Sequence, residues 1–262
     1  VKCSESLARS RRPTVPMPEI EEVDTTGGVP EEEVPEEEAV EPGSDADLER
    51  FFLKVKCTKE EALTAKHLQW GWKEMGKEDG AALAFVIRNN PVCITLDLFV
   101  NEIYEEAGAL VGLALKDNVK LKSLDLQQAQ IGVEGGRAIA EALRTNTTLM
   151  NLKLYYNCLG PVGTKAIAEA LQANTKLTNL DLGDNGVARQ GCEALAAMLG
   201  KNTTLARLDV SKNVGVQGDD EAKGLLSAAA AKRKAPLNLI MNDEPGQRWS
   251  VDGFVDVVEW TR

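Results

Sequence analysis

The chain contains few of the residues that catalysis or metal binding requires. Its single histidine is His67, and its five cysteines show neither metal-ligand spacing nor a disulfide framework: Cys3, Cys57, Cys93, Cys158 and Cys192. A lone imidazole excludes most Ser-His, Cys-His and zinc mechanisms, so we expect His67 to be structural. The stretch from Gly200 to Thr203 lacks the flanking residues of a phosphate-binding loop. The sequence therefore predicts a protein that is not an enzyme and that uses no metal and no cofactor.

Residue types that are common in protein interfaces recur instead at a fixed spacing. Leu121, Leu149, Leu177 and Leu205 lie 28 residues apart, and each begins a phrase with apolar residues in its first, fourth and sixth places. An internal period of this length indicates a repeat architecture. Charged and aromatic side chains stand between and just after these apolar places, so the elements of the repeat must position them.

Each repeat is predicted to contain one short strand and one helix. Alternating apolar residues, such as Leu152 and Leu154 around Lys153, are typical of an extended segment. The second half of the repeat, for example residues 163–174, has an apolar stripe at helical spacing. One such unit cannot bury its own apolar face, so neighbouring units must stack. The predicted fold is an α/β solenoid, a horseshoe with parallel strands on its concave face and helices on its convex face.

The repeat register covers residues 65–262 in about seven units. Backward steps of 28 residues reach the phrase at Cys93 and then a degenerate copy that begins at Ala65. Leu237, Leu239 and Asn242 continue the register if the preceding unit has 29 residues. The regular spacing thus predicts one repeat domain with atypical first and last units.

The repeats resemble the ribonuclease-inhibitor subclass of leucine-rich repeats. The phrase LxxLxLxxNxIGxxGxxAIAEAL, followed by NTTL, carries this resemblance. In that family the ninth-place Asn is buried and bonds the backbone of the turn, a role that the resemblance implies for Asn101, Asn157, Asn185, Asn213 and Asn242. Ala129 interrupts the series, so either Gln130 replaces the amide or water satisfies that turn. A second set of asparagines is expected to end the helices: Asn118, Asn146, Asn174 and Asn202.

The concave face provides the candidate binding surface. Residues between the strand leucines should project from it, and they offer carboxylates together with aromatic and cationic anchors. The candidate partner-binding residues are Asp97, Phe99, Asp125, Gln127, Lys153, Tyr155, Asp181 and Asp209. An alternative interpretation is that these aspartates only keep the face soluble. An acidic face argues against nucleic acid, whose phosphates need clustered basic residues, and is compatible with a basic protein partner.

Two functions follow from this surface and from the resemblance. The first is a non-enzymatic scaffold, monomeric on its own, that binds a protein through the concave face. The second is a GTPase-activating role, because Ran GTPase-activating protein combines this repeat type with an acidic segment. Arg137 and Arg189 are the generic candidates for that alternative.

The regions outside the repeats differ sharply in composition. Residues 1–47 are predicted to be a disordered tail rich in Pro and Glu, since residues 19–49 contain fourteen acids and no Lys or Arg. The tail is either an acidic interaction arm or a solubilising extension. Residues 48–64 are predicted to form a helical cap, with a capping box between Thr58 and Glu61. At the other end an amphipathic helix is expected to carry Val251, Phe254, Val255 and Val258.

Composition also bears on location. The absence of cysteine-rich caps favours a reducing, cytoplasmic compartment. The first residues could be the remnant of a targeting peptide, so an organelle remains open. No apolar run reaches the length of a membrane span.

Overall fold

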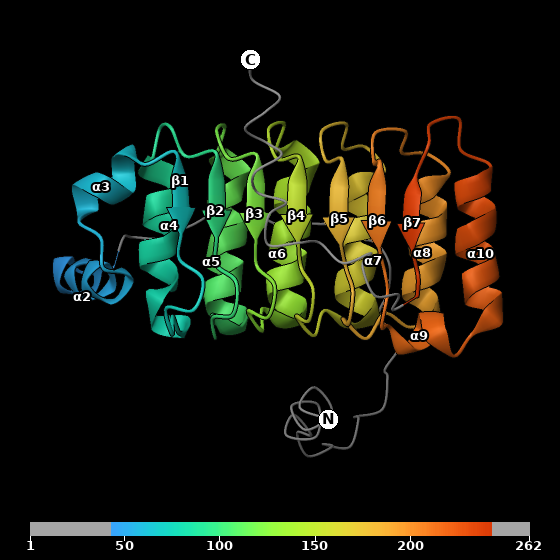
Figure 1. Ribbon diagram of the computed structural model, residues 1–262, viewed down its shortest axis with the longest axis horizontal. Helices are drawn as coiled ribbons and strands as arrows, with labels where there is room; N and C mark the ends of the chain where they lie inside the picture. The colour runs from blue at the N-terminus through green and yellow to red at the C-terminus, as the bar shows by residue number, and fades with distance from the viewer. Residues whose placement is uncertain (1–42, 243–262) are drawn as a thin grey trace, which may run out of the picture. The chain divides into compact units, whose positions relative to one another are not determined.

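The computed structural model of the chain describes residues 43–242, shown in colour in Figure 1. Within this segment, strands and helices alternate, and the strands form one sheet in chain order. The strands are β1 (His67–Gln69), β2 (Thr95–Asp97), β3 (Ser123–Asp125), β4 (Asn151–Lys153), β5 (Asn179–Asp181), β6 (Arg207–Asp209) and β7 (Asn238–Ile240). The helices are α2 (Asp45–Val55), α3 (Lys59–Thr64), the 3-10 helix η1 (Lys77–Asp79), α4 (Gly80–Asn89), α5 (Tyr104–Asp117), α6 (Gly132–Thr145), α7 (Gly160–Leu171), α8 (Arg189–Leu199), α9 (Val214–Gln217) and α10 (Asp220–Ala231).

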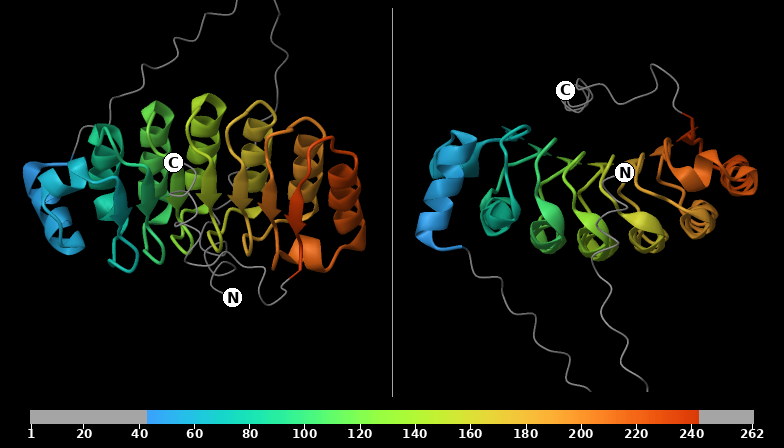
Figure 2. Two further views of the ribbon diagram at one scale, coloured as in Figure 1. Left: turned by 45° about the horizontal axis from the view of Figure 1, so that its top comes forward. Right: turned by 90° about the horizontal axis from the view of Figure 1, so that it is seen from below.

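The predicted α/β solenoid is confirmed. Neighbouring strands from β1 to β6 pair in parallel with partners 28 residues apart, so that Leu68 lies opposite Leu96 and Leu96 opposite Leu124. The degenerate first unit therefore forms a true strand. The right-hand view of Figure 2 shows the strands in one layer and the helices that connect them in another. We call the exposed side of the strand layer the strand face.

The core lies between these two layers. The middle residue of each strand points inward, and Leu124, Leu152, Leu180 and Leu208 are all fully buried. Helix residues such as Ile139 meet them from the other layer. Burial of one such side chain contributes roughly 1.5–3 kcal/mol, so the leucines that stack at 28-residue intervals stabilise the fold substantially.

The last strand does not follow the predicted register. Leu208 lies opposite Leu239, 31 residues later, and Asp209 lies opposite Ile240. The prediction of a 29-residue unit, which aligns Leu208 with Leu237, is wrong by two residues. A two-residue shift keeps every side chain on the same face of a strand, so alternation of apolar residues cannot detect it. The extra residues accommodate the short helix α9, which other repeats lack.

Two helices cover the N-terminal end of the repeats. Helix α2 buries Leu48, Phe51, Phe52 and Val55, the residues that the helical spacing predicts. Thr58 and Glu61 form the predicted capping box at the start of α3. Helix α2 begins at Asp45 after the N-cap Ser44, so the last residues of the predicted disordered tail are helical. The rest of that tail and the predicted C-terminal amphipathic helix lie outside the described residues.

Candidate functional site

Side chains on the strand face form columns, because parallel pairing places equivalent residues side by side. The central column consists of Gln69, Asp97, Asp125, Lys153, Asp181, Asp209 and Ile240. The outer column follows two residues later in each repeat and consists of Gly71, Phe99, Gln127, Tyr155, Gly183 and Ser211. All eight candidate partner-binding residues therefore belong to two adjacent columns.

The aspartates of the central column have a structural task at the ends of their strands. In each case the Oδ1 atom accepts a hydrogen bond from the backbone N–H two residues later. The donors are Phe99 to Asp97 at 2.9 Å, Gln127 to Asp125 at 3.0 Å, Gly183 to Asp181 at 2.9 Å and Ser211 to Asp209 at 2.9 Å. This bond supports the interpretation that Asp recurs here partly because it ends the strand.

Much of the central column is not the exposed surface that the sequence predicts. Asp125, Lys153, Asp181 and Asp209 are each only 3–4% exposed. Adjacent strands lie about 4.8 Å apart, so neighbouring side chains within one column cover one another. Asp97, near the N-terminal end, is half-buried, as are Phe99, Gln127 and Tyr155.

Burial makes the electrostatics of this column strong. The Nζ atom of Lys153 lies 3.1 Å from Oδ2 of Asp125, and both side chains are buried. Burial, reinforced by the Asp209 carboxylate, raises the pKa of Asp181 to about 7. Burial and, to a lesser extent, the Asp125 carboxylate also raise the pKa of Asp97. The column therefore contains carboxyl groups in quite different environments.

Tyr155 joins two later repeats on the strand face. Its hydroxyl donates to Oδ2 of Asp184 at 3.4 Å and accepts from Nζ of Lys212 at 3.2 Å. The Lys212 Nζ atom also lies 5.7 Å from the centre of the Tyr155 ring. A Cβ atom on Gly183 would come within 2.9 Å of that ring, so glycine makes room for it. Lys212 and Asp184 are contacts that the sequence pattern does not predict, because they come from different repeats.

The turn asparagines form the implied ladder across repeats. Asn157, Asn185 and Asn213 are 0–1% exposed, and Asn101 is 2% exposed. The Oδ1 atom of Asn185 accepts from the N–H groups of Asn157 and Leu159 in the preceding turn. Its Nδ2 group donates to the carbonyls of Leu154 and Gly183. Each amide thus bonds backbone groups that the preceding turn leaves unpaired.

Ala129 leaves a gap in this ladder. By the spacing, its side chain should serve the N–H groups of Asn101 and Ile103, and neither group has a hydrogen bond to another described residue. Gln130 does not replace the amide, because its Nε2 atom instead lies at the surface, 3.5 Å from Glu102. That alternative is wrong, and satisfaction of the turn by water stays a prediction.

Asn242 is not a member of the ladder. It is exposed, and the 31-residue offset of β7 places it two residues before the equivalent position. The turn that it would serve is also different, since the N–H groups of Val216 and Gln217 bond the carbonyl of Asn213 within α9. The assignment of Asn242 is therefore wrong for the same reason as the register of the last unit.

A second asparagine ladder lies at the ends of the helices. Asn146 accepts from the N–H groups of Thr148 and Leu149 and donates to the carbonyls of Leu115 and Asn118 in the preceding repeat. The same pattern recurs at Asn90, Asn118, Asn174 and Asn202. These asparagines do end or follow their helices, yet their main role is to join repeats. The spacing Asn-x-x-Leu, together with the buried amide, is the signal for this second ladder.

Arg233 takes the place of asparagine at the end of that second ladder. It lies 31 residues after Asn202, and its guanidinium donates to the carbonyls of Asn202 and Leu205. An arginine can satisfy two carbonyls but offers no acceptor in return. The replacement of asparagine by Arg233 therefore agrees with the atypical character predicted for the last repeat.

The residues that suggested catalysis have structural partners. The Nδ1 atom of His67 lies 2.9 Å from Oγ1 of Thr95 in the adjacent strand. Arg189 forms ion pairs with Glu193, Asp219 and Glu221. Arg137 lies on α6, exposed beside Glu134. Among residues 43–242, no group of His, Cys, Asp or Glu side chains is arranged to hold a metal ion.

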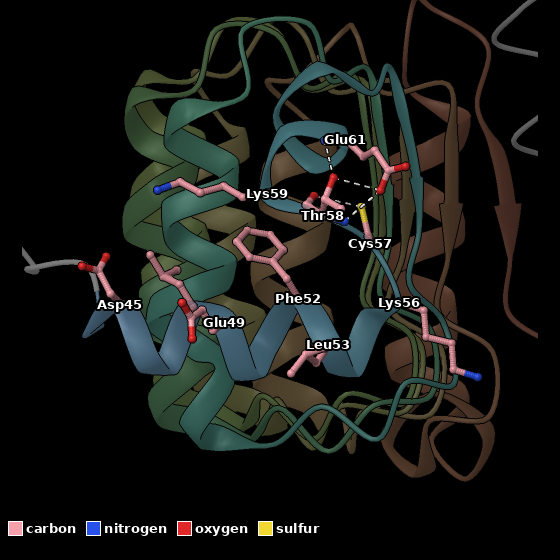
Figure 3. Close-up of a pocket in the computed structure, with 10 residues that line it drawn as sticks. Asp45, Glu49, Phe52, Leu53, Lys56, Cys57, Thr58, Lys59 and Glu61 are labelled. Carbon is pink, nitrogen blue, oxygen red and sulfur yellow. Dashed lines mark hydrogen bonds between the residues drawn. The ribbon is translucent and has the colours of Figure 1, made fainter.

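A pocket of about 920 Å³ lies beside the N-terminal helices and away from the strand face (Figure 3). Its walls combine apolar residues such as Phe52 and the exposed Leu53 with Lys56, Lys59 and Glu61. The two charge signs are interspersed, so the lining indicates no particular ligand.

The thiols of the described segment do not decide the compartment. Cys57, Cys93 and Cys192 are free, and burial raises the pKa of Cys93 to about 12 and that of Cys192 to about 11. Cys158 is not among these free thiols. Intracellular location therefore stays a prediction. Within residues 43–242, no helix has both the length and the apolar character needed to cross a bilayer.

Comparison with known proteins identifies the repeat. The family model described as "Leucine Rich repeat" matches residues 117–140, 145–168 and 173–196. No curated protein matches the chain. Among the solved structures that match is "Leiomodin-1 Actin-Binding Site 2 (ABS2)", with 25% identity over 58% of this chain and 90% of that chain, and a TM-score of 0.47. Residues 117–196 are thus leucine-rich repeats of the ribonuclease-inhibitor-like type, and the sheet register carries the same unit back to β1.

Proposed function

We propose that this chain is a non-enzymatic scaffold that binds a protein partner through its strand face. The observation that carries the proposal is the pair of adjacent columns, which runs without interruption across the strands. An open face of this extent suits a protein partner, whereas small molecules are usually held in enclosed pockets.

The accessible anchors of this face are aromatic and charged. Phe99 and Tyr155 are half-buried, and Lys212 and Asp184 flank the Tyr155 ring. Aromatic and cationic side chains in such clusters contribute most of the binding energy in many interfaces. The central column contains four aspartates and one lysine, Lys153, and this excess of acidic groups favours a basic partner.

The GTPase-activating alternative lacks a supporting observation. The three ion pairs of Arg189 hold its guanidinium against its own chain. Arg137 belongs to the helix layer. We therefore do not extend the proposal to catalysis on a GTPase.

Variants of the two faces test the proposal. Cross-linked partners are captured on wild type, on the strand-face variant Tyr155→Ala and on the helix-face variant Lys165→Glu, whose exposed side chain lies 3.8 Å from Glu169. We expect capture of a specific partner to fall with Tyr155→Ala and to persist with Lys165→Glu. The opposite ranking would move the site to the helix layer.

Deletion of residues 1–42 separates the tail from the repeats. We expect the shortened chain to keep the partner that Tyr155→Ala loses. Loss of every partner on deletion alone would assign binding to the acidic tail instead of the strand face.

A further inference from the structure

Trp72 is a large apolar side chain that the fold does not bury. It is 69% exposed, and it follows Gly71 just beyond β1. Its φ angle is +59°, in the left-handed region that disfavours bulky residues. The equivalent residues Val100 and Gln128 share this conformation, so glycine would fit the position without strain. The left-handed backbone is therefore a feature of the repeat, whereas the largely exposed indole is particular to this unit and offers an apolar surface to a partner.

Phe99 holds this indole at the edge of the strand face. The two rings meet edge to face, with centroids 5.6 Å apart and an interplanar angle of 85°. The backbone N–H of Trp72 also donates to the carbonyl of Phe99 at 2.9 Å. The strand-end loops of two neighbouring repeats therefore present an ordered aromatic pair.

The Asp97 carboxylate lies beside the backbone that carries this aromatic pair. Its Oδ1 atom accepts the N–H of Phe99, and a Cβ atom on Gly71 would lie 3.5 Å from both of its oxygens. Glycine at position 71 therefore leaves space beside the carboxylate. We call Gly71, Trp72, Asp97 and Phe99 the aromatic corner.

Asp97 differs from Asp125 in lacking an ion pair among the described residues. Lys153 pairs with Asp125 at 3.1 Å, whereas Asp97 has no ion pair with any residue in the range 43–242. Burial raises the pKa of Asp97, and the Phe99 N–H and the charge of Lys153 offset this only in part, so the charged form is incompletely compensated. A cation from outside the chain would supply that compensation.

We infer that the aromatic corner binds an arginine side chain of a protein partner. A planar guanidinium can pair with the Asp97 carboxylate while it stacks on the exposed indole face of Trp72. Lysine lacks the planar fork and fits such a site less well. This inference rests on the proposed scaffold function and places one of its anchors at the N-terminal end of the strand face.

The test uses a fluorescein-labelled arginine–glycine repeat peptide as the probe. Citrulline and lysine versions of the same peptide serve as ligand controls, because citrulline keeps the shape of arginine without its charge. Binding is followed by anisotropy and by the indole N–H resonance of Trp72, which is assigned by its absence in Trp72→Gly. We expect wild type to prefer arginine over citrulline by roughly tenfold.

Three variants locate the binding. Trp72→Gly and Asp97→Asn should each weaken the arginine peptide by roughly tenfold. Gln128→Gly, at the equivalent left-handed position, is the matched control and should bind as wild type does. The thermal midpoints of Trp72→Gly and Gln128→Gly should be similar, because the indole is exposed and glycine relieves the left-handed strain at both positions.

The outcomes separate this inference from the proposed function. Three results would overturn the aromatic corner as an arginine site. They are equal binding of the arginine and citrulline peptides, no binding of either, and binding that is unchanged in Trp72→Gly. If partner capture still depends on Tyr155, the scaffold proposal survives that failure. If instead the peptide requires Trp72 while Tyr155→Ala leaves partner capture intact, the corner stands and the proposed role of Tyr155 in partner binding is wrong.

Discussion

Two polar columns repeat every 28 residues in this molecule, yet they differ in what their side chains join. The turn asparagines bond backbone groups of the preceding repeat, as Asn185 does with Asn157 and Leu159. Each central-column aspartate accepts a hydrogen bond from the backbone N–H two residues later in its own repeat, as Asp181 does from Gly183. The first column therefore connects repeats, and the second ends strands.

This difference explains why one column is uniform and the other is varied. A ladder position needs a donor and an acceptor on one short side chain, and asparagine supplies both. The strand-end bond lies within one repeat and can be given up: Lys153 offers no acceptor there and instead pairs with the Asp125 carboxylate of the neighbouring strand. Variation is tolerated where bonds are local, and the proposed binding residues lie there.

The largest effect should come from removing one rung of the ladder. Asn185→Ala deletes four hydrogen bonds and leaves buried N–H and carbonyl groups unpaired. We expect the free energy of unfolding to fall by about 4 kcal/mol or more in urea titrations. Asn242→Ala is the control and should change it by no more than about 0.5 kcal/mol. Similar losses for both would return Asn242 to the ladder.

A somewhat smaller effect should follow from breaking the buried ion pair of the other column. Lys153→Met leaves the Asp125 carboxylate buried without its cation, which should cost about 3 kcal/mol in the same titration. The double variant Lys153→Met with Asp125→Leu should recover most of that loss. If the single variant is as stable as wild type, the pair does not neutralise the column.

The column should also make stability depend on pH. The pKa of Asp181 is about 7 in the folded chain against an ordinary 3.8, so the folded state binds more protons between these values. Stability should therefore fall as pH rises from about 4 to about 7 and stay low above that. Asp181→Asn keeps the acceptor for Gly183 but cannot ionise, so it should be about 2 kcal/mol more stable than wild type at pH 8. Parallel pH profiles for the two proteins would contradict this account.

The smallest effect should be a gain at the gap in the ladder. Ala129→Asn would offer an amide to the N–H groups of Asn101 and Ile103, at a position where four other repeats bury asparagine. We expect a rise of about 1 kcal/mol in the free energy of unfolding. A decrease would show that the turn is already satisfied and that the larger side chain only crowds it.

Most of the fold is predictable from the sequence, because its signals are local. Leu124 and Leu152 repeat at the spacing that their strands have, and Asn157 recurs at the place where the turn needs it. The last unit escapes prediction since Leu237 and Leu239 both face inward, and alternation cannot choose between them. The missing asparagine at Ala129 is also visible in the sequence. Whether Gln130 replaces its amide depends on the direction of a surface side chain, which the sequence does not show.

The candidate site is less predictable than the fold. Residues such as Asp97 and Tyr155 can be assigned to the strand face from their spacing, but their burial cannot. Trp72 is missed because its unit is degenerate and its neighbour Phe99 is a residue of the next repeat. Lys212 is missed because it reaches Tyr155 across 57 residues of sequence.

The sequence by itself determined the period, the alternation of strand and helix, and the choice of leucine for the interior, because polarity and spacing act along the chain. Tertiary structure alone decided which aspartates are buried, which one pairs with Lys153, and which aromatic rings meet. These properties depend on through-space neighbours, since burial and charge are set by side chains that stacking brings together. The repeat therefore defines the positions, and the packing of unlike repeats gives each position its chemistry.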